Sequence, residues 1–96
     1  MKPSTALQLH RAAVRVVVES HRAGNVRVFG SVLRRCDTDQ SDLDLLVDPT
    51  PDMTLFDIAV IRLELRKLLG VPVDVLTPNA LPDKFRAAVL AGAQPV

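Results

Sequence analysis

The sequence contains no tryptophan and no tyrosine, and its three phenylalanines are the only aromatic residues among 96. Proteins that bind single-stranded nucleic acid commonly stack the bases on aromatic side chains, so this platform is scarce here. Charge does not replace it, because 12 basic and 11 acidic residues leave a net charge of +1. General nucleic-acid binding is therefore not expected.

Cysteine, histidine and long apolar runs are also scarce. The single Cys36 excludes an intramolecular disulfide, and two histidines provide no zinc-ligand spacing. A cytoplasmic location fits this composition. The apolar N-terminal segment is interrupted by four polar residues, His10, Arg11, Arg15 and Glu19, so we expect neither a signal peptide nor a membrane span.

Aliphatic residues, in contrast, are abundant. Hydrophobic residues make up 48% of the chain and the mean hydropathy is +0.20. The length predicts a single domain over residues 1–96, with one sheet, a few helices and no room for a second substrate-binding domain. So small a monomer can bury little of its apolar surface. We therefore expect a homo-oligomer or a complex with a partner protein.

The hydrophobic periodicity predicts an α/β (α+β) fold in which helices cover a small three-stranded mixed sheet, mainly on one face. The expected strands are Val26–Phe29, Leu43–Val47 and the segment Val71–Thr77, whose Pro72 favours an edge position. The expected helices run from Ser4 or Thr5 to Arg22 with a cap at Gly24, from a Thr54–Asp57 capping box to Leu69 before Gly70, and from Pro82 to Ala91 before Gly92. The second of these helices is expected to be largely covered.

Aspartates interrupt two of the expected strands. Side chains alternate between the faces of a strand, so Asp42 and Asp44 point away from the face that carries Leu43 and Leu45. Asp74 repeats the pattern of one acid between apolar neighbours in the third strand. Because burying an unpaired carboxylate costs several kcal/mol, this arrangement predicts a cation: a metal ion, an arginine or a protein partner.

Carboxylates without histidine or cysteine suit Mg²⁺ or Mn²⁺, which accept phosphate oxygens as further ligands. Two such ions, about 3.5–4 Å apart, stabilise the attacking and leaving oxygens of a displacement at phosphorus. The turn at Gly30 and Ser31 supplies a close backbone approach and donors to phosphates, and Arg34 is placed to clamp the terminal phosphates. A nucleoside triphosphate is the expected ligand.

The segment "GSVLRRCDTDQSDLDLLV" resembles the signature of the DNA polymerase β-like nucleotidyltransferase superfamily, a Gly-Ser pair followed after ten residues by Asp-x-Asp. "VDVLT" resembles the strand that carries that superfamily's third carboxylate, and "LPDKFRAAVLAGAQPV" resembles the closing helix of the minimal nucleotidyltransferases. The resemblance implies a polymerase β-like nucleotidyltransferase fold.

By position, the resemblance also implies roles for individual residues. Asp42 and Asp44 would bind both Mg²⁺ ions. Asp74 would bind the catalytic ion and help to activate the acceptor hydroxyl. The triphosphate of ATP would be held by three residues: Gly30, Ser31 and Arg34.

One position departs from the family pattern. The family commonly has glycine directly after the arginine that follows Gly-Ser, and this chain has Arg35 there. This arginine either adds a clamp on the phosphates or weakens the loop.

Minimal nucleotidyltransferases are often the antitoxin of a pair whose toxin is a helical HEPN ribonuclease, and some transfer AMP from ATP to a tyrosine of that toxin. The resemblance therefore implies Mg²⁺-dependent transfer of AMP to a hydroxyl of a HEPN-type toxin. Two alternatives remain. The chain could be a catalytically idle antitoxin that neutralises its toxin by binding alone, or a transferase for a small molecule held in a homodimer cleft.

Other roles for the acidic residues are less favourable. The segment from Asp37 to Asp48 partly fits a calcium loop, but Asp42 stands where that loop needs glycine. Asp37 and Asp39 are then expected to be solvated turn residues. Asp48, just before Pro49, is expected to have a role at the strand end.

Overall fold

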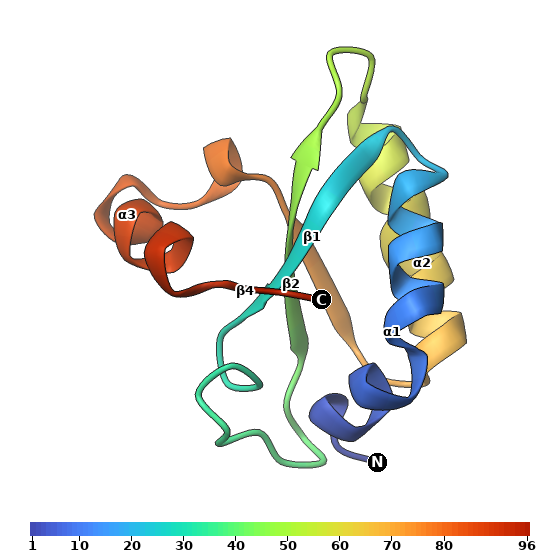
Figure 1. The fold of residues 1–96 in the computed structure, drawn as a ribbon, viewed down its shortest axis with the longest axis vertical. Coiled ribbons are helices and arrows are strands. Elements are labelled where there is room, and N and C mark those ends of the chain that lie inside the picture. The colour runs from blue at the N-terminus through green and yellow to red at the C-terminus, as the bar shows by residue number, and fades with distance from the viewer.

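The computed structural model describes residues 1–96 and has a mixed α+β architecture (Figure 1). Its elements are α1 (Pro3–Glu19), β1 (Ala23–Phe29), β2 (Leu43–Pro49), α2 (Leu55–Leu69), β3 (Val73–Leu76), the short 3-10 helix η1 (Pro78–Ala80), α3 (Asp83–Gly92) and β4 (Gln94–Pro95). The expected fold class is confirmed. None of the helices is both long enough and apolar enough to cross a membrane.

The strands form one mixed sheet in the order β3-β2-β1-β4. Strand β1 is antiparallel to β2 and to β4, and β2 is parallel to β3. The edge position of β3, which Pro72 indicated, is confirmed. The prediction of three strands missed β4, because two residues that include a proline carry no periodicity from which a strand could be predicted.

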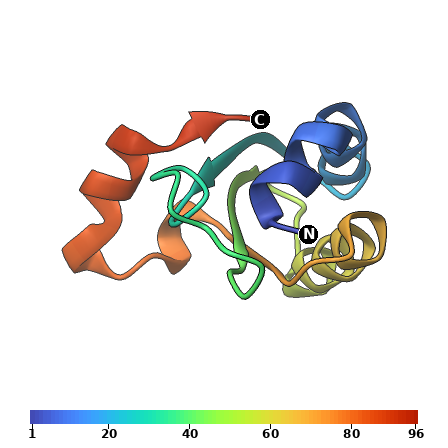
Figure 2. The same cartoon turned by 90° about the horizontal axis from the view of Figure 1, so that it is seen from below.

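Helices α1 and α2 lie side by side on one face of the sheet, while α3 lies on the other side (Figures 1 and 2). The alternation in β2 is confirmed, since Leu43, Leu45 and Val47 are fully buried towards α1 and α2. The expectation that the helices cover mainly one face is wrong for α3. Leu46 explains the need for a second cover, because this side chain of the opposite face is also fully buried.

The end of the first helix and the burial of the second differ from the predictions. Helix α1 ends at Glu19, and Gly24 lies within β1 rather than capping the helix, because Arg22 reverses the chain with a φ of 63°. The Thr54–Asp57 capping box is confirmed by reciprocal hydrogen bonds of 2.9 and 3.3 Å between backbone N–H groups and side-chain oxygens. Helix α2 is less covered than expected, because Leu55 and Phe56 are 88% and 76% exposed.

The prediction that Asp37 is a solvated turn residue is wrong. Asp37 is 8% exposed, and its Oδ2 accepts a hydrogen bond of 2.9 Å from the backbone N–H of Ser4 in the first turn of α1. This bond lowers the pKa of Asp37, although burial opposes it. A carboxylate at a helix N-terminus satisfies a free N–H group and is stabilised by the helix dipole. Asp37 thus fastens the loop between β1 and β2 to α1.

We predict that Asp37→Ala lowers the free energy of unfolding by about 1 kcal/mol near pH 7, because the capping acceptor is lost. The pKa of Asp37 in the folded state is below its ordinary value of 3.8. The stabilisation is therefore present above pH 3.8 and is lost as the pH falls through the lowered pKa. Urea unfolding of both proteins between pH 7 and pH 3 measures the difference. The exposed Asp52→Ala is the control, and equal losses in the two variants would contradict the capping role.

Candidate active site

The sheet places two of the predicted acidic residues side by side. Asp44 in β2 is in register with Asp74 in the parallel β3 and with Phe29 in the antiparallel β1. Residues directly opposite each other on neighbouring strands point to the same face, so these three side chains share the face that α3 borders. Asp44 and Asp74 are partly buried, whereas Asp42 is exposed directly before β2 begins.

These carboxylates repel one another. Burial raises the pKa of Asp44, the negative charges of Asp74 and Asp42 raise it further, and the positive charge of Arg34 opposes the rise. The ion pairs of the protein use other carboxylates, those of Asp39, Glu64, Asp48 and Asp83. The site therefore holds concentrated negative charge, and at Asp44 this charge is opposed by Arg34.

This donor set fits a hard divalent cation. Carboxylate oxygens are the ligands that Mg²⁺ and Mn²⁺ prefer, and a cation would relieve the repulsion around Asp44. The structure does not assemble a complete ligand set, because no three His, Cys, Asp or Glu side chains are close enough together to hold a metal ion. Of the three predicted ligands, the structure brings Asp44 and Asp74 together, and these two would hold the ion, whereas Asp42 does not complete a three-carboxylate cluster with them.

Gly30 brings the turn after β1 against Asp44. Its φ of 75° is in the left-handed region, and a Cβ placed on it would overlap Asp44 Oδ2 and lie 3.1 Å from the Asp44 Cγ. Both facts require glycine. The turn continues with hydrogen bonds from the Arg34 N–H to the Gly30 carbonyl, at 3.1 Å, and from the Cys36 N–H to the Ser31 carbonyl, at 3.0 Å.

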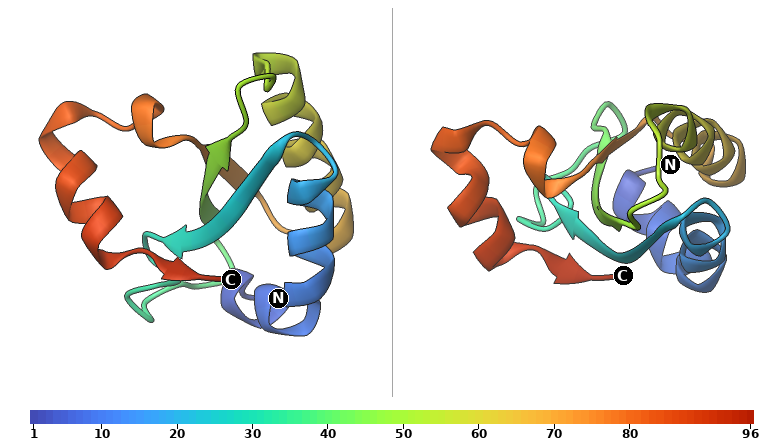
Figure 3. Two further views of the ribbon diagram at one scale, coloured as in Figure 1. Left: turned by 45° about the horizontal axis from the view of Figure 1, so that its top comes forward. Right: turned by 90° about the horizontal axis from the view of Figure 1, so that it is seen from above.

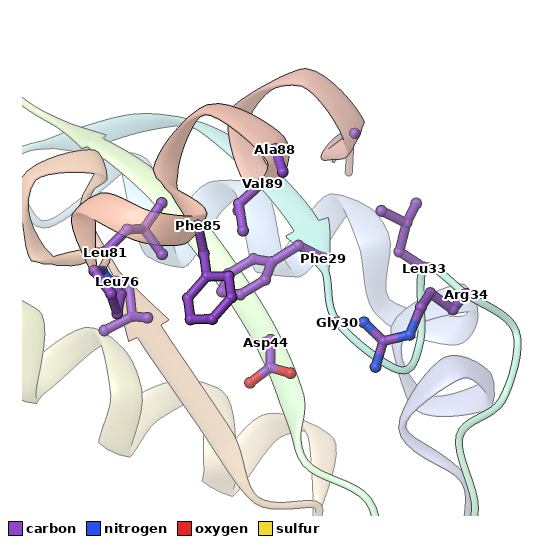
Figure 4. A pocket seen from close by; sticks show the side chains of 12 residues that line it. Phe29, Gly30, Leu33, Arg34, Asp44, Leu76, Leu81, Phe85, Ala88 and Val89 are labelled. Atoms are coloured by element: carbon purple, nitrogen blue, oxygen red, sulfur yellow. The ribbon is translucent and has the colours of Figure 1, made fainter.

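A pocket of about 580 Å³ opens between this turn, the sheet face and α3. Figure 4 shows Asp44 pointing into it from β2, Phe85 pointing into it from α3, and Arg34 at the side of the turn. Of the predicted site residues, Gly30, Arg34 and Asp44 line the pocket, whereas Ser31, Asp42 and Asp74 do not.

Sequence reasoning missed the apolar part of this pocket, which comes from Phe29, Leu33, Leu76, Leu81, Phe85 and Val89. The register of β1 against β2 could have indicated Phe29, because a strand ending at Phe29 and antiparallel to β2 places that residue near Asp44. No sequence signal indicated Phe85, since its position depends on α3 lying across the sheet from α1 and α2.

Arg35 occupies a position that favours glycine for a conformational reason. Its φ is 59°, in the left-handed region, and its side chain is exposed and does not line the pocket. Of the two roles considered for Arg35, this backbone conformation favours a weakened loop over an additional phosphate clamp.

We expect Arg35→Gly to raise the free energy of unfolding by about 0.5 kcal/mol, because relief of the left-handed conformation exceeds the entropy that glycine adds to the unfolded chain. Thermal unfolding measures this change. The control is Arg34→Gly, at a neighbour that lacks a positive φ, and it should be destabilising. A loss of stability in Arg35→Gly as large as in the control would refute the interpretation.

Asp48 has the same strand parity as Asp44 but is engaged elsewhere. Its carboxylate accepts hydrogen bonds from Asn25 Nδ2, at 2.8 Å, and from the Arg27 guanidinium, at 2.6 Å. Both partners belong to β1. Asp48 therefore joins β1 to the end of β2, as its place before Pro49 indicated.

Comparison with known proteins gives consistent matches. A family model described as a nucleotidyltransferase domain matches residues 11–94, which include every predicted site residue. "Putative protein adenylyltransferase MJ0435" of Methanocaldococcus jannaschii is 31% identical over 77% of this chain and 80% of its own, and MJ1217, of the same description and organism, is 26% identical over 81% and 80%. A solved structure described as a putative minimal nucleotidyltransferase is 42% identical, covers 97% of this chain and 95% of its own, and superposes with a TM-score of 0.87.

Proposed function

The chain belongs to the nucleotidyltransferase domain family, and we propose that it transfers AMP from ATP to a hydroxyl group of a partner protein. The observation that carries the proposal is the register of Asp44 with Asp74 beside the Gly30 turn. In the proposed function these two acids bind a divalent cation, and the adjacent turn binds the phosphates. The choice of AMP and of a protein acceptor is supported by the M. jannaschii relatives, each of which is described as a "putative protein adenylyltransferase".

In the proposed reaction the acceptor oxygen forms a bond to the α-phosphorus of ATP, and the bond from that phosphorus to its bridging oxygen breaks to release pyrophosphate. Asp74 accepts the proton of the acceptor hydroxyl. The Gly30–Ser31 turn donates backbone N–H groups to the phosphates, and Arg34 offsets charge on the leaving pyrophosphate. Mg²⁺, when bound, polarises the phosphorus–oxygen bonds and offsets the charge of the triphosphate. Catalysis then depends on positioning and charge rather than on a covalent enzyme intermediate.

For the partner we propose a HEPN-type toxin, with this chain as its antitoxin. The family resemblance supports this choice, and the exposed Leu55 and Phe56 of α2 favour contact with another protein. The same exposed residues also favour the second candidate, an antitoxin that neutralises its toxin by binding alone.

The two candidates differ in their response to loss of the acidic residues. The test incubates the protein with its genomic neighbour, ATP and Mg²⁺, and follows the mass of that neighbour, its toxicity and complex formation. We expect an added AMP on the partner, and we expect the double variant Asp42→Asn, Asp44→Asn to bind without modifying or neutralising it. Full neutralisation by the double variant would instead establish binding as the mechanism. An unmodified partner in a complex with folded wild-type protein would refute AMP transfer.

A further inference from the structure

We propose that the nucleobase of the bound nucleoside triphosphate stacks on Phe85 of α3, and that the pocket selects purines by stacking without reading their edges. This inference rests on the proposed function, because it assumes that the triphosphate lies at the Gly30 turn. It adds the residue that holds the base and the breadth of bases that the site accepts.

The few aromatic residues of the chain are concentrated at this pocket. Two of the three phenylalanines, Phe29 and Phe85, line it, and the third, Phe56, is on α2 across the sheet. Phe85 is 58% exposed, and α3 contains no buried residue. Figure 4 shows its ring pointing into the pocket above Asp44. An exposed ring that faces a pocket next to a phosphate-binding turn is suited to stack on a base.

Arg86, the residue after Phe85, fixes the beginning of α3. Its guanidinium donates to the carbonyls of Pro78, Asn79 and Leu81, at 2.8, 3.3 and 2.7 Å, and pairs with Asp83 at 2.6 Å. At the other end of α3, β4 pairs with β1 (Figure 3). Both ends of the helix that carries Phe85 are therefore fixed by hydrogen bonds, which limits the backbone order that must be gained when a base binds.

The pocket has one polar end and one apolar end. Among its lining side chains only Arg34 and Asp44 carry hydrogen-bonding groups, and both belong to the expected phosphate end. The carbonyls in the corner between η1 and α3 already accept from Arg86. A volume of about 580 Å³ lies within the usual range for ligand pockets of about 300–1,000 Å³. A single ligand with a charged tail and a flat ring matches both ends.

Base selectivity follows from this distribution. A site rejects the wrong base strongly when its buried polar groups would be left unpaired, and no side chain at the apolar end carries such a group. Stacking depends instead on ring area and is tolerant of the base edge. We therefore expect ATP and GTP to bind about equally and UTP to bind more weakly.

The test is calorimetric titration, without acceptor, of ATP, GTP, UTP and inorganic tripolyphosphate in the presence of Mg²⁺. For wild-type protein we expect affinities for ATP and GTP within about tenfold of each other. Phe85→Ala should weaken both by about tenfold or more and leave tripolyphosphate binding unchanged. Phe56→Ala, the same change at an exposed ring away from the pocket, is the matched control and should alter none of these affinities. Phe85→Leu, which keeps apolar bulk in case the smaller side chain disturbs α3, should also weaken ATP binding.

Three results would overturn the inference. Unchanged ATP affinity in Phe85→Ala together with reduced transfer would assign the pocket to the acceptor, while the proposed function would stand. A preference for one purine over the other of more than about tenfold would show that the base edge is read. Wild-type protein that binds no nucleotide in the presence of Mg²⁺ would remove the proposed function and this inference together.

Discussion

Asp44→Asn is expected to reduce the proposed nucleotide transfer by at least about a hundredfold, because an amide cannot supply the charge that would hold a divalent cation against the triphosphate. Asp44 is the acid around which the site is built: it is in register with Asp74, it contacts the Gly30 turn, and it lines the pocket. The initial rate of transfer at saturating ATP and Mg²⁺ measures the effect.

The same substitution should not destabilise the fold. Burial and the neighbouring acids raise the pKa of Asp44 above its ordinary value of 3.8, so ionisation of this carboxyl disfavours the folded state. That penalty is absent below pH 3.8 and complete above the raised pKa. The amide lacks it. Urea unfolding in EDTA should therefore show a variant at least as stable as wild type at pH 7, with the advantage disappearing in acid.

Two results would count against this account of Asp44. A variant that retains most of its transfer activity would show that this carboxylate does not serve the reaction. A variant that loses both activity and stability would show that Asp44 is a structural residue. The exposed Asp52→Asn, which lies outside the pocket, is the control and should leave the transfer rate unchanged.

Gly30→Ala should lower transfer by about a hundredfold, which is the order of loss that a displacement of about 1 Å produces at a reacting centre. An added Cβ would overlap the Asp44 carboxylate, so either the turn or that carboxylate must move. The φ of 75° adds a further cost of about 1–2 kcal/mol to the free energy of folding. Transfer rate and thermal unfolding measure the two effects.

Gly24→Ala is the matched control for this substitution. Gly24 lies in β1, the strand that Gly30 follows, its φ is not positive, and a Cβ there meets no atom within 4 Å. It should retain the transfer rate. If Gly30→Ala were as active as Gly24→Ala, the close approach of the turn to Asp44 would have no catalytic meaning.

Local sequence patterns predicted the parts of the fold that depend on neighbouring residues. The Thr54–Asp57 capping box and the left-handed Gly70 define α2 as the sequence indicated, because both depend on hydrogen bonds and backbone geometry within a few residues. The alternation in β2 likewise predicted that Leu45 faces the core and Asp44 faces away from it.

The residues that were mispredicted depend on contacts between distant segments. Asp37 lies in a polar loop and its sequence neighbours suggest solvent, yet it meets Ser4 at the start of α1. Leu46 is buried on the face that was expected to be open. Phe85 could not be assigned to the site because the side of the sheet that α3 occupies is not encoded in its own periodicity.

The most direct test of the central claim compares two samples of ATP, one labelled at the α-phosphate and the other at the γ-phosphate, with the partner protein and Mg²⁺. The account predicts that wild-type protein transfers the α-label to the partner, that the γ-label leaves with pyrophosphate, and that Asp44→Asn transfers neither. Transfer of the γ-label, or equal transfer of the α-label by wild type and Asp44→Asn, would contradict it.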